Sequence, residues 1–396
     1  MTGPADISIG LLWHASGSGN LGVGALTVGN LAAARRAAAA CGLKPHFKIL
    51  EFAGDFGVTY IDEPDVETFT INTRSMLSPG GFWAQLKSLD CVLDIGAGDS
   101  FADIYGLKRF MFLWLSKALT GLRGRPLVMS PQTIGPFTRQ PYLAMARSAM
   151  TGAAVVVARD PASLAAARKI APKARTLQAV DVAFLLPFER VDHGAPGKVH
   201  VGVNVSGLLF NGGYTKANEF GLDIDYAAMA RKLIVALAAR PDVVVHLICH
   251  VNSDQLPLDD DRAVADRLKQ EFPGVVRAPD FLSPSEAKGY IAGLDFLTAA
   301  RMHACIAAFS AGVAVVPVAY SRKFSGLFQG VLQYPYEVPV RGLSTDEAVS
   351  YILQRLDERD ELKRAAAAGL QVVDELLNGY IEELQRVFRE ATTRRG

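Results

Sequence analysis

Short β-branched runs alternate with longer Ala/Leu-rich stretches along most of the chain, and this alternation restricts the fold more than any other feature. The first pair is the apolar run 7–13 and the helix-like stretch 25–41, joined by a Gly/Ser-rich loop at 14–22. A strand, a loop and a helix in repeated succession form the βαβ unit of a parallel sheet. Because such sheets bind ligands at the carboxyl ends of their strands, we expect functional residues in the loops that follow strands.

The same succession continues to about residue 318, with one interruption. The segment 188–198 is polar and contains Gly and Pro, so we interpret it as a linker between two domains. The length of 396 residues also suits two domains of ordinary size. Further strands are predicted at 91–95, 126–129, 154–158, 199–205, 243–249, 295–299 and 314–318, and further helices at 225–239 and 302–311.

The predicted fold class is α/β, with two Rossmann-like, doubly wound parallel-sheet domains that face each other across a cleft. The N-terminal domain is expected at 1–190 and the C-terminal domain at 199–345. The remaining segment, 346–396, is rich in Ala, Leu, Glu and Arg and is predicted to be helical, with interruptions near Gly369 and Gly379.

Charge and cysteine usage narrow the class of protein. The chain has 41 Lys and Arg against 40 Asp and Glu, so it has no basic field that would hold a nucleic acid, and charge selectivity must be local to a pocket. The chain has four cysteines that form no CxxC pair: Cys41, Cys91, Cys249 and Cys305. We therefore predict neither a zinc module nor a disulfide framework, and we expect the protein in a reducing cytoplasm. No signal peptide is predicted, and the longest apolar runs, about seven residues, fall short of the roughly 20 that span a bilayer.

The sharpest candidate for a functional site is the segment 298–312. A strand is predicted to end near Ala299, and a helix to begin around Arg301 and close at Gly312. A helix start attracts anions because its first N–H groups are unpaired and its dipole is positive there. Arg301 and His303 would lie in this first turn, where a bound phosphate or carboxylate would relieve the conflict between the cation and the dipole. The alternative is a surface Arg beside a His that bonds to a backbone carbonyl.

Other strand ends carry candidates of the same kind. One apolar strand leads to Tyr320 and the adjacent cations Arg322 and Lys323, of which Lys323 is the better candidate to face an anion. Another strand leads to Arg159, a further candidate cation. Gln132 follows a third strand and could bind a hydroxyl or a carboxylate.

Two glycine-rich turns also follow predicted strands. The turn 16–24 opens a helix, but it lacks a clean GxGxxG pattern with a ribose-binding acid, so it is a weak dinucleotide signal. The turn 94–103 contains Asp99, a candidate to orient a sugar hydroxyl or to act as a base; a turn or helix cap is the alternative. His246 and His250 lie on a strand pattern rather than a helix, and no metal site is predicted.

Taken in order, these motifs resemble those of the polysaccharide pyruvyl transferase family, over about residues 7–325. Each motif alone is unspecific, and the ordered set carries the resemblance. The matching pieces are Asn20-Leu-Gly22, Asp94-Ile-Gly-Ala-Gly98, Gln132-Thr-Ile-Gly135-Pro136, Arg159-Asp160-x-x-Ser163, Asp181-Val-Ala-Phe184, Gly202-Val-Asn204-Val-Ser206, Arg301-x-His303 and Tyr320-x-x-Lys323.

The resemblance implies a GT-B-like pair of Rossmann-type domains and a cytoplasmic enzyme of polysaccharide biosynthesis that needs no metal or other cofactor. It implies transfer of a pyruvyl ketal from phosphoenolpyruvate to hydroxyls of a sugar in a polysaccharide or lipid-linked glycan. Arg301, Lys323 and Arg159 would bind phosphoenolpyruvate, with His303 catalytic in the same site. Asp99 is a second catalytic candidate from its place in the turn. The acceptor, or the loops around it, would involve Asn20, Gly22, Gln132, Asn204 and Tyr320.

The chain departs from the family pattern at two places. Val23 follows Gly22 where the family commonly has Asp, and Ala97 replaces the middle one of three glycines. Both departures lie in the half expected to shape the acceptor site, so they concern the acceptor more than the donor. The donor is a polyanion that needs several fixed cations, and a histidine can give a proton to its methylene carbon or take one from a hydroxyl.

Two other functions fit the sequence. A GT-B glycosyltransferase or sugar-nucleotide epimerase would share the architecture but bind a nucleotide sugar. A non-catalytic homologue would bind a small anion as a sensor or scaffold. The predicted partners are phosphoenolpyruvate and a sugar or lipid-linked glycan, with no nucleic acid. The sequence leaves open a peripheral contact with the inner face of the membrane and a homo-oligomer.

Overall fold

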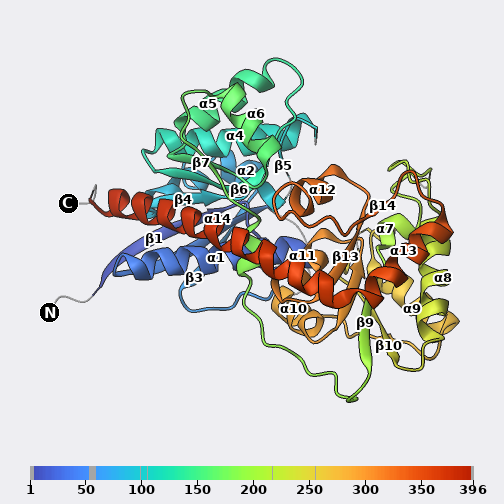
Figure 1. The fold of residues 1–396 in the computed structure, drawn as a ribbon. Helices are drawn as coiled ribbons and strands as arrows, with labels where there is room; N and C mark the ends of the chain where they lie inside the picture. Colours follow the sequence, from blue (N-terminus) through green and yellow to red (C-terminus); the bar gives the residue numbers. More distant parts are fainter. Residues whose placement is uncertain are drawn as a thin grey trace. The chain divides into compact units, whose positions relative to one another are not determined.

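The computed structural model describes residues 4–52, 59–98, 100–104, 106–215, 217–254 and 256–393 (Figure 1). The chain forms two compact units. The first comprises Met1–Ser18, Leu26–Leu186 and Val373–Gly396, and the second comprises Gly19–Ala25 and Pro187–Val372.

The first unit is built on a sheet of eight strands, all paired in parallel. Seven of them follow the order β3-β2-β1-β4-β6-β7-β8, and the short β5 pairs with β6. The direction of winding reverses between β1 and β4, which is the switch point where doubly wound sheets bind ligands. The strands are β1 (Ala5–Leu12), β2 (Leu43–Phe52), β3 (Val66–Ile71), β4 (Cys91–Asp94), β5 (Ser100–Phe101), β6 (Leu127–Ile134), β7 (Val155–Ala158) and β8 (Thr176–Gln178).

Helices cover both faces of this sheet, as its continuous apolar strands require. Ile7 and Ile9 of β1 belong to the core that contains residues of α1 and of the end of α14. Leu12 and Val92 belong to the core on the opposite face, which is formed with α4 and α5 (Figure 1). The helices are α1 (Leu21–Ala40), α2 (Thr73–Leu77), α3 (Phe82–Gln85), α4 (Leu107–Leu122), α5 (Tyr142–Gly152), α6 (Pro161–Ile170) and α14 (Arg359–Thr393) from Val373 onward.

The second unit repeats this architecture with six parallel strands in the order β11-β10-β9-β12-β13-β14. Its switch point lies between β9 and β12. The strands are β9 (Val199–Asn204), β10 (Val243–Ile248), β11 (Val276–Arg277), β12 (Phe296–Ala299), β13 (Ala314–Ala319) and β14 (Val338–Pro339). The helices are α7 (Gly207–Phe210), α8 (Tyr226–Ala238), α9 (Asp261–Glu271), α10 (Pro284–Ala292), α11 (Met302–Ser310), α12 (Arg322–Phe328), α13 (Thr345–Asp357) and the first part of α14.

The predicted α/β class with two doubly wound parallel sheets is confirmed. The strands predicted at 91–95, 243–249 and 314–318 correspond to β4, β10 and β13 within one residue at each end. These strands are visible in the sequence because a parallel sheet covered on both faces has no polar side, so each strand is an unbroken apolar run.

The predicted breaks in the C-terminal helix are wrong. α14 continues through Gly369 and Gly379, and the helical segment is interrupted earlier, at Glu358 between α13 and α14. A Cβ on Gly369 would lie 2.8 Å from Cζ of Phe309 and 3.0 Å from the carbonyl oxygen of Leu332, so packing explains this glycine. None of the described helices, α14 included, is both long and apolar enough to cross a membrane.

The compact units divide the chain differently from the predicted domains. Residues 346–396 were expected to form a separate helical segment, but α14 belongs to the second unit up to Val372 and to the first unit from there on. The loop and first helical turn at Gly19–Ala25 belong to the second unit, although they lie within the predicted N-terminal domain.

Candidate functional site

The candidate site lies at the switch point of the second sheet, where β9 and β12 end beside each other. Asn204, the last residue of β9, pairs in register with Ala299, the last residue of β12. The buried Asn204 side chain accepts a hydrogen bond at Oδ1 from N of Arg301 (3.0 Å). Its Nδ2 donates to O of Ile248 at the end of β10 (2.9 Å). One amide therefore links the ends of three adjacent strands.

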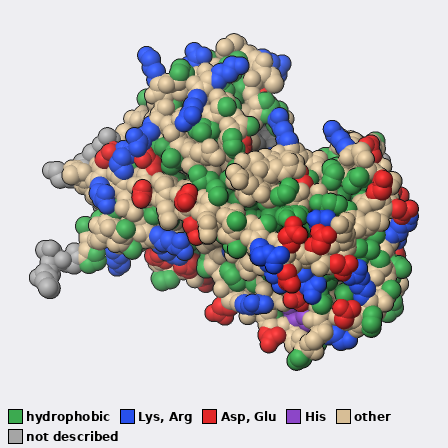
Figure 2. All heavy atoms as spheres, viewed as in Figure 1, with side chains coloured by type: hydrophobic (Ala, Val, Ile, Leu, Met, Phe, Trp, Pro, Cys, Tyr) green, Lys and Arg blue, Asp and Glu red, His purple; other side chains and the backbone are tan. Residues whose placement is uncertain are grey.

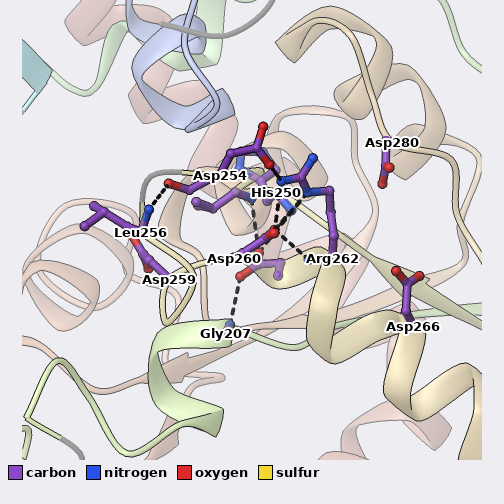
Figure 3. A network of polar contacts seen from close by, with 12 residues as sticks. Gly207, His250, Asp254, Leu256, Asp259, Asp260, Arg262, Asp266 and Asp280 are labelled. Atoms are coloured by element: carbon purple, nitrogen blue, oxygen red, sulfur yellow. Dashed lines mark hydrogen bonds and ion pairs between the residues drawn. The ribbon is translucent and has the colours of Figure 1, made fainter. Parts of the chain in front are cut away.

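Asp261, the first residue of α9, is the hub of the polar contacts at this edge. Figure 3 shows the network around the start of α9, with Gly207 and His250 close to it. The Asp261 carboxylate is fully buried, so its negative charge depends on these donors rather than on water. It accepts hydrogen bonds from N of Gly207 (2.9 Å), N of His250 (3.1 Å), N of Val251 (3.2 Å) and Nδ2 of Asn204 (3.2 Å).

Arg301 completes the network with a guanidinium held by two carboxylates. Its Nη2 lies 2.7 Å from Oδ1 of Asp261 and 2.8 Å from Oδ1 of Asp259. Burial opposes the charge of Arg301, but the two carboxylates outweigh it and raise the pKa above its ordinary value. Within the described ranges nothing accepts a hydrogen bond from Nη1, so a fixed donor remains for a ligand.

The helix after Arg301 starts and stops as the sequence predicts, within one residue. Arg301 is the N-cap rather than a first-turn residue, and its side chain makes no capping hydrogen bond. α11 begins at Met302, so His303 lies in its first turn. Gly312 follows the helix with φ of 72° and donates from its N to O of Phe309 (3.1 Å), which terminates the helix.

His303 lies directly against the early loop that contains Asn20 and Gly22. A Cβ on Gly22 would lie 2.3 Å from Nδ1 of His303 and 3.1 Å from Oδ1 of Asn20. The N of Gly22 donates to Oδ1 of Asn20 (3.0 Å), which caps the start of α1. Only a glycine allows the start of α1 to approach the imidazole this closely, so Gly22 sets where the His303 ring can lie.

The early loop is attached to the second unit by backbone contacts. The N of Leu21 donates to O of His250 (3.2 Å), and the N of Asn252 donates to O of Gly19 (2.7 Å). A Cβ on Gly19 would lie 1.9 Å from the Asn252 carbonyl oxygen, so no other residue fits there without displacement. Asn20 and Gly22, which we expected in the N-terminal domain, therefore lie in the unit that carries Arg301 and His303.

Tyr320 and Lys323 follow the neighbouring strand β13. Tyr320 is packed against Phe220 and Phe324, with ring centroids 5.2 Å and 5.5 Å away. Burial raises the pKa of Tyr320; the charge of Arg301 acts against this shift, which places the phenol in the field of the same guanidinium. Lys323 lies in the first turn of α12 and is half-buried.

Four residues of this candidate site were not among the predicted site residues: His250, Asp259, Asp261 and Tyr226. Burial, reinforced by His303 and Arg301, lowers the pKa of His250 to about 3, so its imidazole is neutral. The hydroxyl of Tyr226 accepts a hydrogen bond from N of Ser206 (3.1 Å) after β9. The signal for His250 was available, because it follows β10 as Arg301 follows β12. The two aspartates carry no such signal, because in the sequence they are ordinary acids at the start of a helix.

The switch point of the first sheet holds an ion pair with no exposed surface. Nζ of Lys117 lies 3.0 Å from Oδ1 of Asp94, at the end of β4, and both side chains are fully buried. Burial lowers the pKa of Lys117, although the Asp94 carboxylate acts to raise it. Nε2 of Gln132 donates to Oδ2 of Asp94 (3.1 Å) and to O of Ser130 (3.2 Å). The amide nitrogen of Gln132, which we predicted as an acceptor ligand, is thus engaged within the protein.

A neutral network lies at the carboxyl end of β1. Burial lowers the pKa of His14 to about 3, and its Nε2 lies 2.9 Å from Nδ2 of Asn30. The hydroxyl of Tyr380 donates to Oδ1 of Asn30 (2.8 Å) and is 2.9 Å from Oγ of Ser130. α14 therefore reaches the sheet edge of the first unit with a buried hydroxyl.

Two further predicted site residues belong to the first unit. Nη1 of Arg159 lies 3.0 Å from Oδ2 of Asp181, and both side chains are buried. Arg159 is therefore paired in a unit separate from the one that contains Arg301 and Lys323. Asp99, the second catalytic candidate, lies outside the described residues.

The described residues contain no group of three or more His, Cys, Asp or Glu that could hold a metal ion. His246, which shares a strand pattern with His250, instead contacts protein groups. Its Nε2 lies 2.9 Å from Nδ1 of His200, and its Nδ1 lies 2.8 Å from the hydroxyl of Tyr290.

Comparisons with known proteins agree with this architecture. Residues 44–322 match the sequence profile of the family described as polysaccharide pyruvyl transferase. A comparison with curated protein sequences found no significant match.

Solved structures share the fold across nearly the whole chain. Sucrose-phosphate synthase from Thermosynechococcus elongatus is 12% identical with a TM-score of 0.58, covering 98% of this chain and 100% of that one. Anabaena Alr3699/HepE, solved with UDP-glucose, is 12% identical with a TM-score of 0.53 and the same coverage. A UDP-N-acetylglucosamine 2-epimerase homologue from Listeria monocytogenes is 11% identical with a TM-score of 0.56, covering 92% and 91%. At these identities the likeness shows the fold alone, a GT-B-like pair of Rossmann-type domains.

Proposed function

The chain belongs to the polysaccharide pyruvyl transferase family, and we propose that it transfers a pyruvyl group from phosphoenolpyruvate to two hydroxyls of a glycan sugar. The observation that carries this proposal is the start of α11, where a fixed guanidinium and an imidazole flank a helix N-terminus without a side-chain cap. Phosphate and carboxylate groups bind such helix starts, and phosphoenolpyruvate carries one of each.

Each group would have a distinct role in binding the donor. The carboxylates of Asp259 and Asp261 fix the guanidinium of Arg301, so its Nη1 donor needs no reorganisation when an anion binds. Lys323, at the end of the next strand, would add a second cation. Arg159, the remaining cation that we expected to bind the donor, belongs to the first unit and is paired with Asp181 there.

The reaction needs one proton delivered and two removed. A proton added to the methylene carbon of phosphoenolpyruvate gives a methyl group and an oxocarbenium-like centre at the carbon that bears the carboxylate. One acceptor hydroxyl bonds to this carbon, phosphate leaves with its oxygen, and the second hydroxyl completes the ketal. The two acceptor hydroxyls release two protons. One restores the proton that was given to the methylene carbon, and the other leaves on phosphate. His303, on the first turn of α11, is the group that would exchange these protons.

Phosphate release tests the proposal. The purified protein is incubated with phosphoenolpyruvate and a panel of lipid-linked glycans, and free phosphate and the mass of the glycan are measured. We expect one phosphate for each pyruvyl group gained. His303→Ala is expected to abolish release while phosphoenolpyruvate still binds by calorimetry. His193→Ala is the matched control, because this half-buried imidazole of the second unit contacts Tyr290 at O (2.9 Å) and should leave turnover unchanged.

Two results would contradict the proposal. Tight binding of a nucleotide sugar with none of phosphoenolpyruvate would favour a glycosyltransferase or an epimerase. Binding of phosphoenolpyruvate with no product across the acceptor panel would favour a non-catalytic anion-binding protein.

A further inference from the structure

One part of the first unit has a charge far from that of the whole chain. Residues 72–152 contain nine Lys and Arg but four acidic residues, all Asp, although the net charge of the chain is +1. Asp90 and Asp94 are buried, and Asp103 bonds to Thr138 with its carboxylate. The surface of this segment is therefore basic. Figure 2 shows one part of it, over α5, where blue side chains lie among green and tan atoms.

Several cations of this segment have no acidic partner among the described residues. Some cations elsewhere on the surface do form ion pairs, as Arg231 does with Glu271 and Arg240 with Asp357. Arg74, Lys87 and Lys108 are exposed, and the described part of the chain places no carboxylate within 4.0 Å of them. Unpaired cations on one surface create a local positive potential that favours an anionic partner.

The same segment exposes bulky apolar side chains. Five of the twelve large hydrophobic residues that the described structure exposes lie in it, including Leu77 (71%), Leu107 (59%) and Leu122 (77%). On α4, Leu107, Met111 and Leu122 recur at helical spacing on one side, while Phe110 is buried on the other. A surface helix normally turns charged residues outward, so an outward apolar side indicates a contact.

The basic and apolar residues belong to adjoining elements. A pocket of about 400 Å³ joins α2 to the first turn of α4; Thr73, Lys108, Arg109 and Phe112 are among its lining residues. At the other end of α4, the guanidinium of Arg123 lies 4.8 Å from the ring of Trp83 on α3. The first turn of α4 has no acidic residue, so both its dipole and its cations favour an anion beside the apolar wall.

We propose that these residues form a surface that binds an anionic phospholipid bilayer from one side, with a lipid phosphate in the pocket. Leucines would enter the headgroup region while the cations contact phosphates, as amphipathic surface helices do. A second copy of the chain fits less well, because pairing this surface with itself would bring like charges together. The proposal does not rest on the reaction proposed above. The surface, called here the α2–α4 face, consists of Arg74, Leu77, Lys87, Leu107, Lys108, Met111 and Leu122.

Vesicle sedimentation tests the proposal without any measurement of activity. The full-length protein is mixed with phosphatidylcholine vesicles, alone or containing phosphatidylglycerol, at low and high ionic strength. We expect sedimentation only with the anionic vesicles, weakened by salt. Arg74→Glu with Lys108→Glu should weaken binding at least about tenfold, and Leu107→Ser with Leu122→Ser about tenfold. All four side chains are exposed, and circular dichroism verifies that the variants fold.

The matched control carries the same charge change in the second unit. Arg267→Glu with Arg364→Glu, two exposed cations, should bind anionic vesicles as the wild type does. Equal binding to neutral vesicles, equal loss in the control, or wild-type binding by both face variants would each overturn the proposal. Two further results would also overturn it. One is a protein that binds no vesicles and forms a dimer by light scattering, which Leu107→Ser with Leu122→Ser disperses. The other is a protein that binds soluble glycerol phosphate but no vesicles.

Discussion

The carboxyl edges of the two sheets have the same topology but differ in how their buried charges are paired. In the first unit, Lys117 and Asp94 pair with no exposed surface, and their charges are satisfied within the protein. In the second unit, Asp261 and its backbone donors hold Arg301, whose side chain remains 11% exposed, beside the first turn of α11. Both edges lie at a switch point, so topology alone does not make a site. The difference is whether the buried charges satisfy one another or leave a donor for a ligand.

Neutralising each ion pair tests this difference most directly. Lys117→Met with Asp94→Asn removes a closed pair, so turnover of the folded enzyme should stay within about threefold of wild type. Arg301→Met with Asp261→Asn removes the donor that we propose stabilises the reacting anion, so turnover should fall roughly 1,000-fold. Phosphate release measures both. Equal losses in the two double variants would show that the edges are not different in function.

Single replacements provide the control for that comparison. Lys117→Met alone leaves the Asp94 carboxylate buried and unpaired, which should lower the free energy of unfolding by about 3–5 kcal/mol. Adding Asp94→Asn should restore most of this loss. Denaturant unfolding followed by tryptophan fluorescence measures it.

Two glycines of helix α1, Gly22 in the second unit and Gly29 in the first, should separate activity from stability. Gly22→Ala would put a methyl group 2.3 Å from Nδ1 of His303 and displace the ring, so turnover should fall about 100-fold with little change in phosphoenolpyruvate binding. Gly29→Ala would meet the carbonyl oxygen of Val182 at 2.1 Å and should lower stability while the folded fraction keeps its turnover. Steady-state kinetics and calorimetry distinguish the outcomes. Loss of phosphoenolpyruvate affinity in Gly22→Ala would mean that it disturbs binding rather than the imidazole.

Acid should destabilise the second unit before the first. Burial lowers the pKa values of His14 in the first unit and of His246 and His250 in the second to about 3. An unfolded histidine titrates near 6.5, so the unfolded chain binds more protons between these values. Each such histidine contributes stability that is complete above pH 6.5 and is lost toward pH 3, by up to about 1.4 kcal/mol per pH unit.

The three tryptophans separate the two units in this experiment, because Trp13, Trp83 and Trp114 all belong to the first. The loss of far-ultraviolet circular dichroism should begin at a higher pH than the change in tryptophan fluorescence. His250→Gln should reduce the pH dependence of the former, and His14→Gln that of the latter. Coincident transitions that neither variant shifts would contradict this assignment.

The smallest expected effects lie on α14, which carries one glycine in each unit. A Cβ on Gly379 would meet nothing within 4 Å, so Gly379→Ala should raise the free energy of unfolding by about 0.5–1 kcal/mol through helix propensity. Gly369→Ala would press on Phe309 and should instead destabilise, by roughly 1–3 kcal/mol. Guanidinium unfolding of both variants measures the sign, and two changes of the same sign would contradict the packing described for Gly369.

The fold was accessible from the sequence because its signals are local. Buried parallel strands leave apolar runs, and the loops after them could be located from those runs alone. The expectation that functional residues follow strands led to Arg301 and Tyr320, and the family resemblance led to Asn204. The structure places these three residues at the candidate site. The helix after Arg301 was predicted for the same local reason, since Gly312 marks its end.

The rest of the site depends on contacts between distant segments. Asp261 acts through partners on Gly207, His250 and Arg301, and within its own segment it is an ordinary aspartate at a helix start. The attachment of the early loop to the second unit depends on the approach of Gly19 to the carbonyl oxygen of Asn252, which no pattern of neighbours reveals. The sequence therefore did not reveal which residues, far apart along the chain, lie close together in the fold.

α14 also has a consequence for the order in which a ribosome could complete this protein. The core of the first unit includes Tyr380, Leu384 and Phe388, which are translated after the entire second unit. The first unit must therefore wait, with part of its apolar interior uncovered, until Phe388 has left the exit tunnel. A cut between the two units would separate the first unit from this part of its core, and so would a truncation before Tyr380.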